Sequence, residues 1–352
     1  MRPPSRNPPR PGRRQSFSRT PEAHVLNHRE IAALTEDQAF ERFSKIVFAK
    51  NGGTPYCPKC GCDAHNIIRR NNKDGSYRTI FKCKSCDTQY TPKSLTKLRY
   101  MKLPYRDLLY ALALFIQFPK GLPAIQLQSF LMRDYGTAKL LARRFREAMH
   151  NDLGSVVLSG EVEADNCEIG GYRRPNNARK SQMKNDPDKM KKTGYKLERD
   201  TKAKLFVTVV RQRGDHGCVR VGVTKTKGES KEVVARNVGK ETILYTDDGG
   251  EYSNMGWAVA DHRPVTHKEN FYTEYADTNR AENYFSMLRR AAFGTYHSIS
   301  DPDFAESYAV EQAWRVTHNR ISNFARYERL LTVLTRPGRS IHTGFYQRRR
   351  AA

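Results

Sequence analysis

Three acidic residues stand where carboxylates could bind divalent metal ions. Asp165 ends an expected strand over 162–165, Asp247 ends another over 242–246, and Glu282 follows 35 residues later within an expected helix. Acids at strand ends can converge on one point, and their hard oxygen ligands suit Mg²⁺ or Mn²⁺. Two such ions can activate an attacking oxygen and stabilise the leaving oxygen of a phosphodiester. By spacing alone, ordinary solvated or helix-capping acids are the favoured interpretation.

The helix expected over 279–293 could present an acid and a base on one face. Its apolar stripe consists of Ala281, Tyr284, Phe285 and Leu288. A neighbouring face carries the polar residues Asn279, Glu282, Ser286 and Arg289. Helical periodicity therefore places a metal-binding acid and a phosphate-binding arginine side by side. A plain helix with solvated charges is the alternative.

Four cysteines are spaced as zinc ligands. Cys57 and Cys60 form one CxxC pair, Cys83 and Cys86 form a second, and 22 residues separate the pairs. Four thiolates close a tetrahedral structural Zn²⁺ site that has no open position for catalysis. Cys62 is an alternative ligand, although we expect it, like Cys167 and Cys218, to be a spectator. The ribbon could bind DNA directly or only support the fold.

The charge of the chain points to a polyanionic partner. Lys and Arg total 62 against 37 Asp and Glu, which gives a formal net charge of +25 over 352 residues. Nucleic acid is the first candidate for such an excess. No apolar run approaches the ~18 residues of a membrane-spanning helix, and the N-terminus lacks the apolar core of a secretory signal. We therefore expect no membrane association and a cytoplasmic, nucleoid-associated protein.

Composition and periodicity divide the chain into five expected parts. They are a disordered basic arm (1–35), a short helix and zinc ribbon (36–98), a helix-turn-helix (99–152), a mixed α/β domain (158–325) and a basic C-terminal tail (326–352). The polar segment 172–200 is expected to be a mobile loop. Helices over 122–132 and 136–150 form the helix-turn-helix, and its second helix should contact DNA. The contacts are expected from Lys139, Arg143, Arg144 and Arg146.

Several segments together resemble the DDE transposases of insertion sequences of the ISXO2-like type. The resembling segments include CPKCG, FKCKSCDTQYTP, EVEADNCEIGG, LYTDDGGEYS and TNRAENYFSMLRR. The resemblance implies a zinc ribbon and an RNase H-like catalytic domain whose mixed sheet is flanked by helices. It implies that Asp165 and Asp247 bind the catalytic metal. The third ligand is either Asn279 or Glu282, and the charge of a carboxylate favours Glu282.

The same resemblance implies further roles and partners. Arg289 takes the place of a basic DNA contact, Arg290 follows it, and His267 matches a family histidine; Asn166 stands where relatives often have Glu. The expected activity is cleavage at terminal inverted repeats followed by strand transfer into target double-stranded DNA, by a homodimer or higher homo-oligomer. Its alternatives are a catalytically silent zinc-containing regulator and a host nuclease or resolvase. Glu311 and Arg315 are expected to form a weak intrahelical ion pair.

Overall fold

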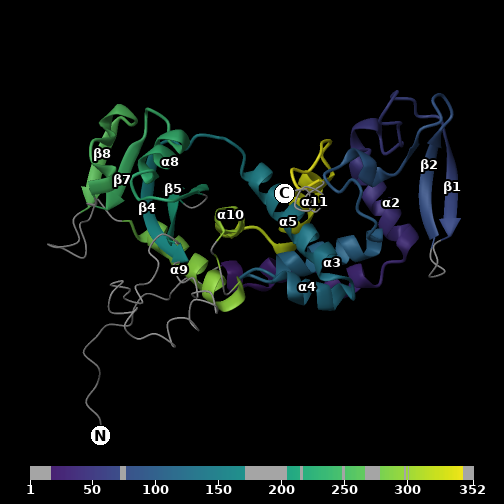
Figure 1. The fold of residues 1–352 in the computed structure, drawn as a ribbon, viewed down its shortest axis with the longest axis horizontal. Helices are drawn as coiled ribbons and strands as arrows, with labels where there is room; N and C mark the ends of the chain where they lie inside the picture. The colour runs from purple at the N-terminus through teal and green to yellow at the C-terminus, as the bar shows by residue number, and fades with distance from the viewer. Residues whose placement is uncertain are drawn as a thin grey trace, which may run out of the picture.

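The computed structural model describes most of the chain. The described residues are 17–71, 77–170, 204–214, 217–247, 250–265, 278–296, 299 and 301–343. The loop expected over 172–200 and the first half of the expected arm lie outside them. Figure 1 shows a small sheet at one end of the molecule, a larger sheet at the other, and helices between the two.

The small sheet is an antiparallel ribbon in the order β1-β2-β3. Its strands are β1 (His65–Asn71), β2 (Tyr77–Cys83) and β3 (Gln89–Tyr90), followed by the short helix η4 (Pro92–Leu95). Helix α2 (Glu36–Val47) precedes the sheet and leads into η3 (Ala49–Asn51). Thr35 and Gln38 form a capping box that begins α2, so the expected short helix starts where the sequence predicts and ends at Val47.

The expectation of disorder up to residue 35 is wrong for its second half. Residues there form η1 (Phe17–Arg19), η2 (Pro21–His24) and α1 (His28–Ala32). Leu26 and Ile31 are buried in the main core, and Gln117 Nε2 donates to Leu26 O over 2.8 Å. The few apolar residues near the end of the arm are therefore enough to dock it, although the composition is basic and polar.

Three helices follow the ribbon: α3 (Tyr105–Gln117), α4 (Ala124–Leu131) and α5 (Tyr135–Leu153). The expected pair of helices joined near Asp134 is confirmed, and the Asp134 side chain accepts a hydrogen bond from Thr137 N, which begins α5. However, every residue of α5 from Leu141 to Met149 is buried, because the helix packs against α4, α10 and α11. It is the central helix of this body.

The large sheet has the strand order β6-β5-β4-β7-β8. Its strands are β4 (Glu161–Gly170), β5 (Lys204–Gln212), β6 (Val219–Thr224), β7 (Ile243–Asp247) and β8 (Asp261–Val265). The first three strands are antiparallel neighbours, whereas β4, β7 and β8 run parallel. Helices flank the sheet, and the expected RNase H-like mixed sheet is confirmed.

The helices of this domain are α8 (Ser230–Asn237), α9 (Asn279–Ala291) and α10 (Pro302–Thr317). Short turns η6 (Gly250–Tyr252) and η7 (Met255–Trp257) follow β7, and a π-helical turn (Ala292–Tyr296) ends α9. Helix α9 packs against β4 and β5, and α10 packs against β5, β6 and α5. The helical body and the sheet therefore share an extensive boundary.

The segment expected as a basic tail contains a core helix instead. Helix α11 (Asn323–Thr335) buries Tyr327, Leu330, Leu331 and Leu334. It packs against α5, α3 and α2, and Arg42 of α2 forms an ion pair with Glu328 at 2.6 Å. The expectation of a basic tail followed the composition of the last residues and overlooked the apolar stripe at the start of this segment.

Candidate active site and zinc site

Two of the three expected acids lie side by side on neighbouring strands. Strand β4 pairs with β7 in parallel, and Ala164 is in register with Thr246. Asp165 and Asp247 each follow these residues by one position, so they occupy adjacent strands at the same level. Asp247 ends β7 as expected, but Asp165 lies in the middle of β4 because pairing with β5 continues to Gly170.

Helix α9 begins on a buried carboxylate of β4. Glu163 is 1% exposed, and its Oε2 accepts hydrogen bonds from Arg280 N at 2.9 Å and Ala281 N at 3.2 Å. Its Oε1 accepts one from Arg213 Nε at 3.0 Å. Free amides at the beginning of a helix favour a negative charge. Glu163 therefore holds the first turn of α9 against the strand that carries Asp165.

The apolar stripe expected for α9 is confirmed, because Ala281, Tyr284, Phe285 and Leu288 are all buried. Its polar face is exposed: Asn279, Glu282, Ser286, Arg289 and Arg290. Arg290 Nε donates to Ser286 O at 3.1 Å. The helix thus keeps the candidate acid and the candidate phosphate contacts out of the core.

The three acids are close enough for the charges of Asp247 and Glu282 to act on Asp165. Burial raises the pKa of Asp165 to about 6, and the negative charges of Asp247, Glu282 and Glu251 add to the rise. Further along β4, burial raises the pKa of Cys167 to about 12, and the charge of Arg289 opposes that rise. Glu282 thus lies near Asp165 and Arg289 lies near Cys167. Carboxylates that repel one another in a half-buried site are suited to a cation.

Two further residues of this site were not singled out from the sequence. Glu251 follows β7 and accepts a hydrogen bond from Asn166 Nδ2 at 3.0 Å, and the same amide donates to Tyr252 Oη. Asn166, the departure from relatives, therefore ties η6 to β4. Glu163 was also missed, although its place two residues before Asp165 puts both side chains on one face of the strand.

One further expected member of the site, His267, lies outside the described residues. Within the described part of the chain, only the four cysteines bring three or more ligand atoms within 4.8 Å of one another. The carboxylates of Asp165, Asp247 and Glu282 do not all lie within that distance of one another.

The four cysteines have the geometry of a structural zinc site. Cys57 Sγ lies 3.6 Å from Cys86 Sγ, and Cys60 Sγ lies 3.5 Å from Cys83 Sγ. Four sulfur ligands at zinc bond lengths are separated by about 3.7 Å. Hydrogen bonds with Thr88 lower the pKa of Cys86 to about 6, which favours the thiolate that zinc requires. The donor set fits one Zn²⁺.

The two CxxC turns are built alike. Gly61 N donates to Cys57 O at 2.9 Å, and Asp87 N donates to Cys83 O at 3.1 Å. Both residues that follow the second cysteine of a pair adopt left-handed backbone, with φ of 75° at Gly61 and 54° at Asp87. Cys62 Sγ instead lies 3.8 Å from Ala64 O and does not join the cluster.

Three of the four helix-turn-helix side chains expected to bind DNA are buried in the structure. Arg143, Arg144 and Arg146 are 7%, 2% and 5% exposed. Arg143 lies over the Phe304 ring at 4.3 Å, and Arg144 Nη1 donates to Arg99 O at 3.0 Å. Because α10 and α11 cover this helix, the expectation that these arginines contact DNA is wrong for this arrangement. Lys139 is half-buried over Phe304.

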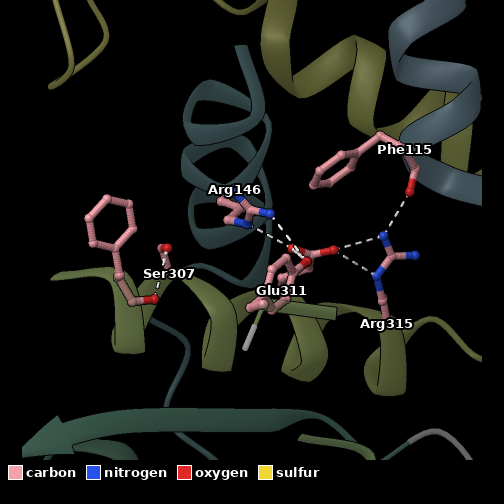
Figure 2. A network of polar contacts seen from close by, with 7 residues as sticks. Phe115, Arg146, Ser307, Glu311 and Arg315 are labelled. Atoms are coloured by element: carbon pink, nitrogen blue, oxygen red, sulfur yellow. Dashed lines mark hydrogen bonds and ion pairs between the residues drawn. The ribbon is translucent and has the colours of Figure 1, made fainter. Parts of the chain in front are cut away.

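Arg146 belongs to a buried ion-pair network, which Figure 2 shows from close by. Its Nε donates to Glu311 Oε2 at 2.7 Å, and Arg315 Nη2 donates to Glu311 Oε1 at 2.9 Å and to Phe115 O at 2.7 Å. Although burial opposes the charge, Arg146 and Arg315 hold the pKa of Glu311 below its usual range. The expected Glu311–Arg315 pair is confirmed, but it is buried and links α10 to α5 and α3.

The strand order and the acids on β4, β7 and α9 define an RNase H-like domain joined to a zinc ribbon. Residues 157–317 match the model of the ISXO2-like transposase domain, and residues 34–89 match the transposase zinc-ribbon domain. These two matches cover well over half of the sequence, and the chain belongs to the ISXO2-like transposases. A search of curated proteins gives no significant match. No helix among the described residues could span a membrane.

Proposed function

We propose that this protein cleaves the ends of an insertion sequence and joins them to target DNA. The observation that supports the proposal best is the convergence of charge at the β4–β7 pair inside the large sheet. Burial raises the pKa of Asp165 there, and the negative charges of Asp247, Glu282 and Glu251 add to the rise. The family match over the same residues points to DNA transposition. In the first step, water would attack the phosphodiester at the element end, break its P–O3′ bond and release a 3′-OH. In the second step, this 3′-OH would attack a phosphodiester of the target DNA, forming a new P–O bond and releasing the target's own 3′-OH.

The residues of this site would have separate roles. Asp165, Asp247 and Glu282 are the proposed ligands of two Mg²⁺ or Mn²⁺ ions, which supply activation of the attacking oxygen and stabilisation of the leaving oxygen. Arg289 would position a DNA phosphate beside them, as it projects from the same exposed face of α9. Arg290 is a second candidate contact. No side chain need become covalently attached to DNA.

Asn279 remains the competitor of Glu282 for the third ligand position. Asn279 begins α9, and Glu282 lies one turn later on the same face. The electrostatic effect of Glu282 on Asp165 favours Glu282. Target DNA, terminal inverted repeats and a homo-oligomeric complex are part of the proposal, because strand transfer joins two ends to one target.

A strand-transfer assay tests the proposal directly. The purified full-length protein is incubated with a labelled duplex that carries the terminal repeat flanking its gene, a supercoiled target plasmid, and Mg²⁺ or Mn²⁺. Joined products that require the terminal repeat and the divalent ion are the expected result. Repeat-specific binding without nicking in either metal would identify a catalytically silent regulator, and nicking without a repeat requirement would identify a general nuclease.

A further inference from the structure

The surface between the zinc ribbon and the start of the helical body is strongly basic. A groove of about 470 Å³ lies there, and its charged lining residues are Arg78, Lys93, Arg99 and Lys102. Among the described residues that line it, none is acidic. Three of the four are at least partly exposed, and Lys93 is buried at the base of the groove. Positive potential is therefore concentrated in one concave surface.

The ribbon beside this groove carries like charges in opposed positions. Arg70 on β1 is directly opposite Arg78 on β2 in the antiparallel register, and both side chains are exposed. Like charges in directly opposed positions destabilise a sheet. Arg70 Nη2 donates to Gln89 Oε1 at 3.3 Å. The acceptor of this hydrogen bond is a neutral amide, which does not neutralise the charge of the guanidinium. An external anion is the partner that would relieve the repulsion.

The opposite wall is a turn held in a fixed conformation. Tyr100 is 67% exposed and has a φ of 67°, a left-handed conformation that is unusual for a large side chain. The Arg99 guanidinium lies over the Tyr100 ring at 4.9 Å. The turn is supported from within, because buried Arg144 donates to Arg99 O and the Lys93 ammonium donates to Leu103 O. Helix α5 therefore supports this surface instead of presenting its own arginines.

We propose that this groove binds the sugar–phosphate backbone of double-stranded DNA, with Arg78 and Lys102 contacting phosphates and the Tyr100 ring packing against the sugar edge. The inference rests on the proposed function, since it locates the DNA contact of the N-terminal half. It assigns affinity and orientation to the groove, because phosphate contacts do not read sequence. It also gives the ribbon a direct role in DNA binding beyond its support of the fold.

Binding of the full-length, zinc-loaded protein to labelled duplexes tests the proposal. One duplex carries the terminal repeat and the other a shuffled sequence. Arg78→Ala and Lys102→Ala should each reduce the slope of log affinity against log salt by about 1, and the double variant should bind both duplexes about tenfold more weakly. Tyr100→Ala should weaken binding without a change in the salt slope. Lys50→Ala is the matched control, because Lys50 is exposed in η3 but does not line the groove.

The outcomes separate this inference from the proposed function. If the double variant binds with the affinity and salt slope of the parent, the groove is not the backbone site, while end binding and strand transfer by the parent still stand. If the parent binds neither duplex, both proposals fail. If duplex RNA or anionic vesicles bind the parent more tightly than DNA and lose affinity in the double variant, the groove serves a different polyanion. Zinc content should stay unchanged and the melting temperature should not fall, because Arg78 and Lys102 are exposed.

Discussion

Glu163 Oε2 lies 2.9 Å from the backbone nitrogen of Arg280, so the strand that carries Asp165 also holds the first turn of the helix that carries Glu282. The two halves of the candidate active site are 117 residues apart in sequence. A single buried carboxylate connects them, and it does so through backbone amides whose positions do not depend on the side chain of Arg280.

Glu163→Gln should therefore reduce strand transfer while DNA binding is retained. The amide keeps the shape of the carboxylate but loses its negative charge, which accepts hydrogen bonds from Arg213 and from the backbone amides of α9. We expect the free energy of unfolding to fall by about 1–3 kcal/mol. Glu161→Gln is the matched control, since Glu161 is on the same strand and pairs with the same Arg213 at 3.4 Å, but is half exposed. Equal losses of strand transfer in the two variants would contradict a positioning role for Glu163.

The proposed metal ligands make a second prediction. Asp165→Asn, Asp247→Asn and Glu282→Gln should each abolish cleavage and strand transfer and leave end binding nearly intact, because each amide keeps shape and removes charge. Single-turnover cleavage and binding of the terminal repeat are the two measurements. An inactive Asn279→Ala beside an active Glu282→Gln would reassign the third ligand, and normal cleavage by all four variants would end the two-metal mechanism.

Zinc content gives a third prediction. Elemental analysis should return one zinc per chain, and Cys83→Ser should lose it, because the fourth thiolate completes the tetrahedron. Cys62→Ser should retain zinc, since its sulfur is outside the cluster. Chelation should unfold the ribbon, whose own apolar core consists of few buried residues. Zinc retained in Cys83→Ser would show that another residue supplies the ligand.

The buried ion pair makes a fourth prediction, on stability. Arg146→Met should lower the free energy of unfolding by about 3–5 kcal/mol, because it leaves the Glu311 charge buried with only Arg315 opposite. Arg236→Met is the control: Arg236 pairs with Glu232 at 3.0 Å on an exposed helix face, and its loss should cost about 0.5 kcal/mol or less. Denaturant unfolding measures both. Similar costs would mean that the Arg146 network contributes no more than a surface pair.

Local patterns in the sequence predicted the parts of this protein that depend on local structure. The stripe of α9 follows from helical period, and the zinc site follows from the CxxC spacing, because both are set by residues close in sequence. The surroundings of α5 could not be predicted in this way. Its arginines have the spacing of a DNA-binding face, but α10 and α11, which lie far along the chain, cover them. Asp165 lies within β4 for the same reason, since β5 extends the strand from a distance.

The position of α11 also bears on how the chain reaches its native state. Residues after α10 return to the first half of the chain: Gly338 N donates to Leu95 O, and Ser340 Oγ donates to Glu147. The large sheet is thus inserted in the sequence between the helices of one body, because α11 follows the sheet and α5 precedes it. On the ribosome, α5 must wait for α11 to emerge before its buried face is covered, so this half should remain dependent on late, long-range contacts, whereas the ribbon can close on zinc early.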